Sequence, residues 1–351
     1  MKNFKDKVKQ ITKKRLFWPI LVLLMVLIFD MVFIEGFLRI EMKNGNLYGR
    51  IIDIVNRASS LAILAVGMTL VIATGGIDIS VGSVVAISGA IVVQLLGVGE
   101  TANTPFFICI LLALVVSTVF GMWNGLLVAK IGVQPVVATL ILMVAGRGIA
   151  QLITNGQIPT TQHKPFSYIA GFLPGLPLPF SIFIVAAVLV IAGLVIKKTA
   201  LGLLIESVGV NPTASKFAGI AVQRVVFLTY AISGLCAGIA GLMISSMIKA
   251  ADSNNAGYLI EMDAILAVAI GGNSTRGGRF SIAASVVGAL VIQCLTTTLY
   301  ALGVSPQVLP VVKALVVAAI CLMQSEAFHR MISGIFKRNR GLHHEKAVAK
   351  F

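Results

Sequence analysis

A few ionisable and amide side chains stand inside long apolar stretches of the sequence, and these residues could do chemistry. Asp78 lies in residues 75–82, GGIDISVG, between two apolar runs, and Ser80 follows two residues later. An acidic group in such surroundings is costly unless it faces water, a partner or the protein interior. Two interpretations are open: Asp78 lies at the mouth of a path for a polar solute, or it caps the helix that begins near Ser80.

A second polar set has the period of a helix. Arg147, Gln151 and Asn155 recur every four residues and so share one helix face. On a membrane helix such a stripe faces an aqueous path or hydrogen-bonds to a neighbouring helix, and Asn124 is a lesser version of the same pattern. The residues expected to line a solute path are the polar ones of these runs: Asp78, Ser80, Asn124, Arg147 and Gln151.

The motifs of enzymes are absent from the sequence. There is no G-x-x-x-x-G-K-[ST] phosphate loop, no H-E-x-x-H and no G-x-S-x-G. The four cysteines lie in separate apolar runs without close spacing, so they are expected to be small buried residues and not metal ligands. We therefore expect no catalytic residue, no metal and no cofactor in this chain, and energy from a nucleotide would have to come from a partner.

Residues 201–224, LGLLIESVGVNPTASKFAGIAVQR, are the one structured-looking segment between long apolar runs in the middle of the chain. Asn211-Pro212 is a strong helix start, and Gly219 is a natural helix stop. A shorter helical pattern ends at Gly209. The segment is expected to expose Leu203, Ile205, Val208 and Phe217 as a surface for another protein, although an ordinary connecting loop is the alternative.

Composition makes the chain a membrane protein. Of its 351 residues, 58% are hydrophobic and 12% are charged, whereas soluble domains carry about 25% charged residues. The net charge is +15, and seven of the 28 basic residues fall within residues 2–15 and six within residues 330–350. Basic ends predict two cytoplasmic termini and contact with anionic membrane lipid. No aromatic residues interleave with a basic patch, so nucleic-acid binding is not expected.

Ten apolar runs are long enough, or nearly so, to cross a membrane. The predicted spans are residues 16–37, 51–74, 80–98, 105–129, 135–153, 180–196, 225–248, 259–270, 280–302 and 308–323. The predicted organisation is a basic cytoplasmic segment (1–15), an all-α transmembrane domain (16–325) and a basic cytoplasmic tail (326–351). Alternation of sides puts residues 201–224 in the cytoplasm and residues 250–255, AADSNN, on the outer face.

Two glycine-rich breaks share the pattern GG-x5-G, and each precedes a long apolar run. They are residues 75–82, GGIDISVG, and residues 271–278, GGNSTRGG. Similar breaks in two halves of a membrane protein predict an internal repeat with unwound backbone at a transport site. Tight cytoplasmic hairpins are the alternative interpretation.

Four stretches, in order, resemble one known family. They are residues 73–83 (ATGGIDISVGS), 134–153 (QPVVATLILMVAGRGIAQLI), 206–220 (ESVGVNPTASKFAGI) and 261–278 (EMDAILAVAIGGNSTRGG). They resemble the permease subunits of bacterial ABC importers for monosaccharides, the ribose, galactoside and arabinose group, over about residues 51–323. Within that group, residues 137–153 and 254–257 are most similar to permeases of galactofuranose importers.

The resemblance implies a vitamin-B12-importer-like fold of about ten helices in the bacterial inner membrane. It also implies a pore shared with a second related permease subunit, an ABC ATPase that binds ATP and Mg²⁺, and a periplasmic sugar-binding protein. The residues expected to dock the ATPase are Leu203, Glu206, Gly209, Asn211, Pro212, Ala214, Phe217 and Gly219. Those expected to contact the binding protein are Asn254, Asn255 and Glu261. Ser215 and Arg276 depart from the residues usual in the family.

The predicted function is therefore the transmembrane subunit of an ATP-driven monosaccharide importer, with galactofuranose as the sugar that the resemblance indicates. The rival is a secondary transporter coupled to protons or sodium, in which Asp78 and Arg147 would be ion-coupling groups. That rival leaves the segment 201–224 without a purpose. A membrane scaffold without transport is a third possibility.

Overall fold

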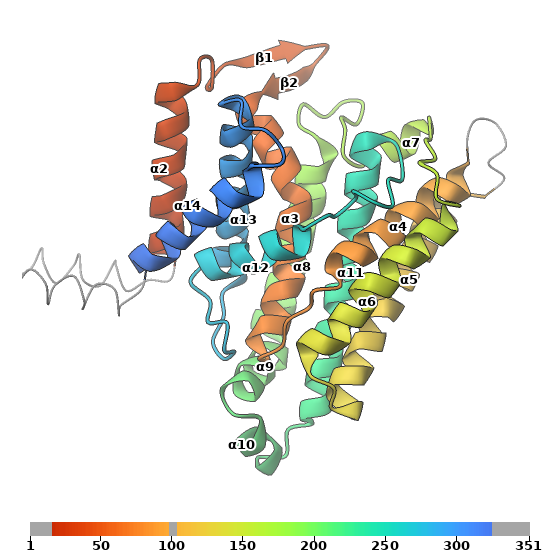
Figure 1. Ribbon diagram of the computed structural model, residues 1–351, viewed down its shortest axis with the longest axis vertical. Helices are drawn as coiled ribbons and strands as arrows, with labels where there is room; N and C mark the ends of the chain where they lie inside the picture. Colours follow the sequence, from red (N-terminus) through yellow and green to blue (C-terminus); the bar gives the residue numbers. More distant parts are fainter. Residues whose placement is uncertain (1–15, 98–103, 325–351) are drawn as a thin grey trace, which may run out of the picture.

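The computed structural model describes residues 16–97 and 104–324 (Figure 1). The basic segments 1–15 and 326–351, both predicted to be cytoplasmic, lie outside the described residues. The long helices are α2 (Phe17–Phe33), α3 (Arg50–Ala73), α4 (Val81–Leu96), α5 (Phe106–Leu126), α6 (Pro135–Ile153), α8 (Phe180–Lys198), α11 (Val222–Ile248), α13 (Ile282–Ala301) and α14 (Leu309–Gln324). The shorter ones are η2 (Leu127–Ile131), α7 (Lys164–Ser167), α9 (Leu201–Val210), α10 (Pro212–Phe217) and α12 (Ile260–Ile270).

Each of the ten predicted apolar runs contains a helix. In the part of the chain that the structure describes, six helical stretches are long and apolar enough to cross a membrane, namely α3, α5 with η2, α6, α8, α11 and α13. The apolar helices α2, α4, α12 and α14 are shorter, with 17, 16, 11 and 16 residues. Helices of 11 residues rise only about 17 Å, so α12 spans part of a bilayer at most.

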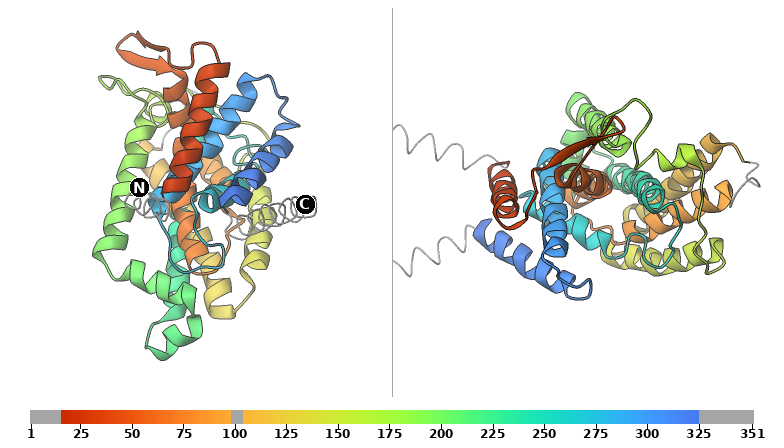
Figure 2. Two further views of the ribbon diagram at one scale, coloured as in Figure 1. Left: turned by 90° about the vertical axis from the view of Figure 1, so that its left-hand side faces the viewer. Right: turned by 90° about the horizontal axis from the view of Figure 1, so that it is seen from above.

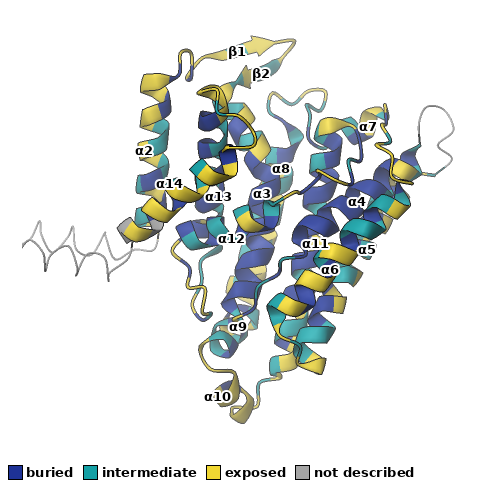
Figure 3. Cartoon of the chain, viewed as in Figure 1, coloured by how far each residue is buried: buried dark blue, intermediate teal, exposed yellow. Residues whose placement is uncertain are grey.

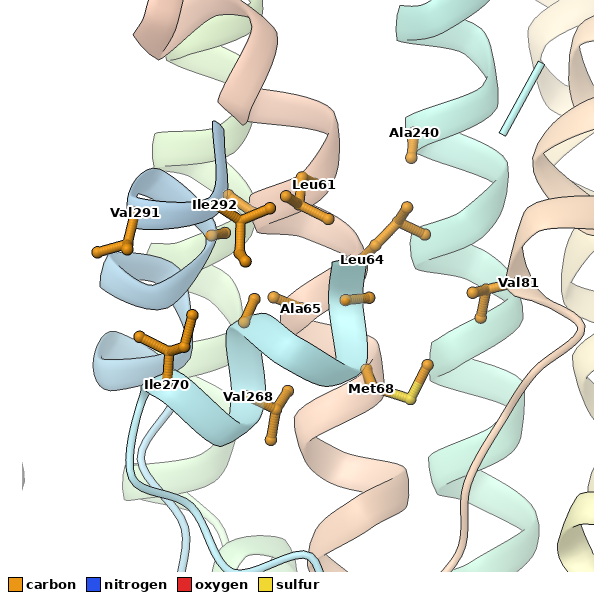
Figure 4. Packing of buried hydrophobic residues seen from close by; sticks show 14 of the residues in the cluster. Leu61, Leu64, Ala65, Met68, Val81, Ala240, Val268, Ile270, Val291 and Ile292 are labelled. Atoms are coloured by element: carbon orange, nitrogen blue, oxygen red, sulfur yellow. The ribbon is translucent and has the colours of Figure 1, made fainter. Parts of the chain in front are cut away.

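Helix α3 is the centre of the bundle. Every residue from Ala58 to Ala73 is buried, and α11 packs along α3, α4 and α5. The largest apolar cluster joins α3 to α12, α13 and α11 through residues such as Leu64, Met68 and Val268 (Figure 4). Burial is concentrated on α3, α4 and α11, while α2 and α10 are largely exposed (Figure 3). Only Ser181 of α8 is buried, so α8 is a peripheral helix with apolar faces suited to lipid.

Helices α5 and α11 approach each other closely at Gly121 and Gly234. A Cβ added to Gly121 would lie 2.9 Å from the Cα of Gly234 and would overlap the carbonyl oxygen of Tyr230. Because no side chain separates the two backbones there, small residues set this contact. The close approach brings the polar residues of α11 beside those of α5 and α4.

The structure contains a β-hairpin, which the prediction of an all-α chain did not include. Strands β1 (Ile40–Lys43) and β2 (Asn46–Gly49) pair antiparallel, with Lys43 opposite Asn46. Asn44 and Gly45 form the turn, with φ of 52° and 80°, the dihedral pattern for which Asn-Gly is preferred. The Asn-Gly dipeptide was the available sequence signal. The hairpin lies at the end of the molecule opposite α9 and α10 (Figures 1 and 2).

Candidate functional site

The first glycine-rich break is an extended segment between α3 and α4, which leads from the end of α3 near α9 to the start of α4 deeper in the bundle (Figure 1). It is not a tight surface hairpin, because Gly76, Asp78 and Ser80 are buried. A Cβ on Gly76 would lie 2.6 Å from the hydroxyl oxygen of Tyr230. That hydroxyl donates to the carbonyl of Ile77 at 3.4 Å. The segment is thus non-helical backbone held inside the protein, one of the two settings, with the lining of an aqueous cavity, in which such backbone is tolerated at membrane depth.

Asp78 accepts three hydrogen bonds in this interior. Its Oδ1 accepts from the backbone N–H of Ser80 at 3.1 Å and from the Ser80 hydroxyl at 2.6 Å. Its Oδ2 accepts from the Ser233 hydroxyl of α11 at 2.8 Å. Ser80 is the residue before α4, and no side chain of the described residues caps that helix. The carboxylate of Asp78 therefore closes a local turn with the residue two positions on, and the interpretation of Asp78 as a helix cap is not met.

Asn124 of α5 completes the group, which we call the Asp78 cluster (Asp78, Ser80, Asn124 and Ser233). Its Nδ2 donates to the Ser80 hydroxyl oxygen at 2.8 Å, while its buried Oδ1 has no hydrogen-bond partner among the described residues. All four side chains are at most 1% exposed. The cluster joins the extended segment to α5 and α11, and in this conformation it is closed to solvent. Its place on a solute path stays a prediction.

Three members of the Asp78 cluster were among the five residues predicted for the solute path, whereas Ser233 was missed. Residues 229–246 of α11 contain several small polar and glycine residues, and nothing in their spacing singles out the serine that meets Asp78. Tyr230, one turn before Ser233, was missed for the same reason. The contact becomes visible only once the α5–α11 crossing is known.

Arg147 and Gln151 belong to a different group, which holds the loop before α12. The Nη1 of Arg147 donates to the carbonyls of Ser253 at 3.1 Å and Ala256 at 2.6 Å. The Nε2 of Gln151 donates to Oδ1 of Asn254 at 2.6 Å. Two members of the predicted polar stripe therefore contact residues 253–256, and not the Asp78 cluster. The third, Asn155, lies beyond the end of α6 with φ of 51° and does not continue the helix face. Two sets predicted separately, for the solute path and for the binding protein, meet here.

Asp252 shapes the same loop. Its carboxylate accepts from the backbone N–H groups of Asn254 and Asn255 at 3.1 and 3.0 Å and from the Asn255 side chain at 2.8 Å. Partial burial by itself would raise the pKa of Asp252, but these hydrogen bonds and the positive charge of Arg147 outweigh it and hold the pKa below its usual value. Asn254 and Asn255 are exposed, as a surface for a partner requires.

Glu261 lies beneath this loop and not on the surface. It is in the first turn of α12, is 2% exposed and occupies the space that a side chain on Gly82 of α4 would need. The positive charge of Arg147 attracts the Glu261 carboxylate. Its contact with a binding protein stays a prediction, and in this conformation Glu261 offers no exposed surface for it.

Two further intramembrane carboxylates pair with side chains that sequence reasoning did not link to them. Asp30 of α2 is fully buried and accepts from Thr298 of α13 at 2.6 Å and from the Cys294 thiol at 3.2 Å. Asp263 of α12 forms an ion pair with Lys313 of α14 at 2.8 Å. These pairs bind the peripheral helices α2 and α14 to the bundle. No group of three or more His, Cys, Asp or Glu side chains in the described ranges could hold a metal ion.

The segment 201–224 forms the two predicted helices. Asn211 accepts from the backbone N–H of Ala214 at 2.9 Å and caps α10, Pro212 is the first residue of α10, and Gly219 has φ of +83° just after the helix. Helix α9 continues through Gly209, which was expected to end it. The apolar side chains of Leu203, Val210 and Phe217 are 70%, 72% and 88% exposed.

The prediction that Ile205 and Val208 are exposed is wrong. They are 0% and 1% exposed and pack in a cluster with Leu70, Ala73 and Val225. Helix α9 carries apolar residues on more than one face, with Glu206 and Ser207 as its polar residues, and the contact with the end of α3 decides which apolar face is covered. Of the other predicted docking residues, Asn211, Pro212 and Ala214 are exposed and Glu206 is half-buried.

Comparison with known proteins assigns the chain to a family. A family model described as the permease component of the branched-chain amino acid transport system matches residues 50–323. The galactofuranose transporter permease protein YtfT of Escherichia coli (strain K12) is 47% identical, over 93% of this chain and 96% of that protein. The fructose import permease protein FruF of Bifidobacterium longum (strain NCC 2705) is 41% identical, over 98% and 96%. The ribose import permease protein RbsC of Escherichia coli (strain K12) is 35% identical, over 78% and 85%.

No solved structure matches the chain at a significant level. The family match begins at the first residue of α3 and ends in the last turn of α14, so it includes the Asp78 cluster, the loop before α12 and the segment 201–224. Since residues 16–97 and 104–324 contain six helical stretches able to cross a membrane, the chain is a multi-pass membrane protein, and it belongs to this family of transport-system permease components.

Proposed function

We propose that the chain is the membrane-spanning permease subunit of an ATP-driven importer for a monosaccharide. Three relatives named as permeases for galactofuranose, fructose and ribose support a monosaccharide cargo. Galactofuranose is the sugar to test first, because the relative named for it is 47% identical over nearly the whole chain. The protein moves the sugar and does no covalent chemistry.

One observation carries the assignment to an ATP-driven system. The segment 201–224 presents Leu203, Val210 and Phe217 to solvent on two short helices, yet the chain contains no phosphate-binding loop. Exposed apolar side chains on a rigid protrusion are suited to a protein partner. We assign that partner as an ABC ATPase subunit, which binds ATP and Mg²⁺.

The complete importer has three further features in this proposal. A second related permease subunit forms the pore with this one, in a vitamin-B12-importer-like arrangement of about ten helices per chain. A periplasmic sugar-binding protein docks on the opposite end, at Asn254 and Asn255. The chain lies in the bacterial inner membrane with both termini in the cytoplasm, where basic residues contact anionic lipid.

Transport follows from a rigid-body movement. Closure of the ATPase displaces α9 and α10, and the packed bundle responds by changing which side of the membrane its solute path faces, since tightly packed interiors switch between discrete arrangements. Polar groups on that path replace the water that a sugar hydroxyl loses. The candidates are Asp78, Ser80, Asn124, Arg147 and Gln151.

The test is uptake by the complete importer in reconstituted vesicles. Phe217→Asp places a charge in the docking surface and should abolish ATP-dependent sugar uptake and capture of the ATPase, while Phe217→Leu, which keeps an apolar side chain, should retain both. Normal uptake by the Phe217→Asp variant would count against the proposal. Collapse of the proton and sodium gradients with ATP present should leave uptake intact. If uptake stops instead, the secondary-transporter rival is correct.

A further inference from the structure

Three stretches of backbone meet without any side chain between them where α9 reaches the bundle. They are Gly209 of α9, Ala73 and Gly75 at the end of α3, and Gly277 and Gly278 of the second glycine-rich break. The N–H of Gly278 donates to the carbonyl of Ala73 at 2.9 Å. A Cβ added to Gly209 would overlap that carbonyl oxygen and the nitrogen of Gly278. A Cβ on Gly277 would lie 3.0 Å from both the Gly209 oxygen and the Gly75 nitrogen.

Glycine is needed at this meeting point, which we call the glycine joint (Gly209, Ala73, Gly75, Gly277 and Gly278). Gly75, Gly277 and Gly278 have φ of 85°, 89° and 94°, values that other residues rarely adopt. Gly209 is helical, so its backbone angles suit any residue. Its requirement for glycine comes from the close approach alone.

Each of the three chain segments that meet at the glycine joint leads to a different part of the proposed transport machinery. Gly209 lies on the docking helix α9, which is also fixed to α3 through the buried Ile205 and Val208. From Gly75 the chain runs three residues to Asp78, whose hydrogen bonds reach Ser233 of α11 and, through Ser80, Asn124 of α5.

From Gly277 and Gly278 the second break leads back to α12 and forward to α13. Within it, Asn273 is buried and donates to the Ser285 hydroxyl of α13 at 2.8 Å, and its Oδ1 accepts from the N–H of Ser281 at 2.7 Å. Thr69 of α3 donates to the same Ser285 hydroxyl at 2.6 Å. Both glycine-rich breaks are therefore fastened at the joint and again within the bundle.

We propose that Gly209 is a positioning residue that transmits the movement of the docking helices to both glycine-rich breaks at once. The reason is mechanical. Side chains at an interface can change rotamer and absorb a shift, whereas backbone against backbone cannot, and dense packing passes the displacement on. This inference rests on the proposed function and adds the route from the ATPase to the Asp78 cluster.

The first experiment measures sugar transported per ATP hydrolysed by the reconstituted importer. Gly209→Ala must push α9 away from Ala73 and Gly278, because the atoms it meets are backbone. Gly209 was predicted to dock the ATPase, but the backbone of Ala73 and Gly278 fills the place of its side chain and leaves no room there for a partner. We therefore expect the ATPase to remain bound and active while transport per ATP falls about tenfold, the size typical of a mutation in a coupling network. The matched control is Gly193→Ala in α8, a helical glycine with nothing within 4 Å of an added Cβ, which should keep the wild-type ratio.

The second experiment leaves the glycine joint unmutated. Nitroxide labels at Ser207→Cys in α9 and Thr275→Cys in the second break, in a background with the native cysteines replaced by alanine, report the distance between them through the nucleotide cycle. That distance should stay constant in a transporting complex. A distance that changes between the nucleotide-free and ATP-bound states would overturn the inference.

The outcomes separate the two proposals. If the wild-type importer moves no sugar with ATP, the proposed function fails. If the wild type transports and Gly209→Ala has the same transport per ATP, only the glycine joint fails. Loss of ATPase capture by Gly209→Ala would also overturn it, because the substitution would then act on docking and not on transmission.

Discussion

The hydroxyl of Ser233 donates a hydrogen bond of 2.8 Å to Asp78 from a helix 155 residues further along the chain. This bond, with those from Ser80, turns an isolated intramembrane acid into the point where the first glycine-rich break is attached to α11. The carboxylate accepts two hydrogen bonds from Ser80 and one from α11, and these hold the extended segment in place.

Replacement of Asp78 by asparagine should weaken this attachment. The amide keeps the shape but presents an NH₂ group to a hydroxyl that donates in the wild type, and a buried polar group left without a partner costs about 1–3 kcal/mol. We expect Asp78→Asn to lower the free energy of unfolding in detergent by about that amount and to reduce uptake. Asp53→Asn removes an exposed acid paired with Arg57 and should cost less than about 1 kcal/mol. Equal stability losses in the two variants would contradict the argument.

Loss of the Asn211 cap should weaken ATPase docking. The side chain satisfies the N–H of Ala214 in the first turn of α10, and a cap of this kind contributes about 0.5–2 kcal/mol to its helix. Asn211→Ala should therefore lower the affinity for the ATPase subunit by about three- to thirtyfold. Surface plasmon resonance with the permease in nanodiscs measures this affinity. Asn211→Asp keeps the cap and should bind nearly as the wild type does. Equal affinities for Asn211→Ala and the wild type would rule out a role for the cap in docking.

Arg147 should control the mobility of the loop before α12. Its guanidinium supplies both hydrogen bonds to the carbonyls of Ser253 and Ala256, so Arg147→Gln should speed hydrogen–deuterium exchange across residues 252–257 about tenfold or more. Gln151→Ala removes one bond to an exposed side chain and should change the exchange far less. Unchanged protection in Arg147→Gln would show that the loop is held by other contacts.

The same loop should resist acid. The folded-state pKa of Asp252 is lowered, so the stability contributed by its hydrogen bonds is fully present above the unfolded-state pKa, which is about 4, and is lost only as pH falls through the lower folded-state value. A nitroxide label at the exposed Tyr258→Cys should show constant mobility from neutral pH down to the unfolded-state value and increased mobility only below it. With Asp252→Asn added, the label should be mobile throughout. Loosening of the wild-type loop near neutral pH would contradict this sign.

Sequence patterns were sufficient where local chemistry decides the structure. Apolar run length predicted every long helix, and Asn211, Pro212 and Gly219 predicted both ends of α10 because capping is a local interaction. Asp78, Ser80 and Asn124 were selected as polar residues in apolar runs, and they do lie together. Their function as a solute path is still a prediction.

Tertiary contacts decided the rest. Ile205 and Val208 are buried because α9 packs against the end of α3. Apolar residues stand on more than one face of α9, so the sequence alone did not indicate which face is covered. Ser233 and Thr298 are ordinary small polar residues until helix crossings bring them to Asp78 and Asp30. The hairpin at Asn44-Gly45 is different, since its turn signal was present in the sequence and was overlooked.

The ion pair between Asp263 and Lys313 has a consequence for how the protein is made. Lysine costs up to about 3 kcal/mol at the centre of a membrane helix and less near its end, where Lys313 lies as the fifth residue of α14. Helix α14 therefore enters the membrane more favourably with its counter-ion than without it. Asp263 in α12 precedes Lys313 by 50 residues, and α14 gains its counter-ion only after α12 has been delivered. We expect membrane insertion of the last helix to follow the one that carries its partner, which makes Lys313 a checkpoint on the order of assembly.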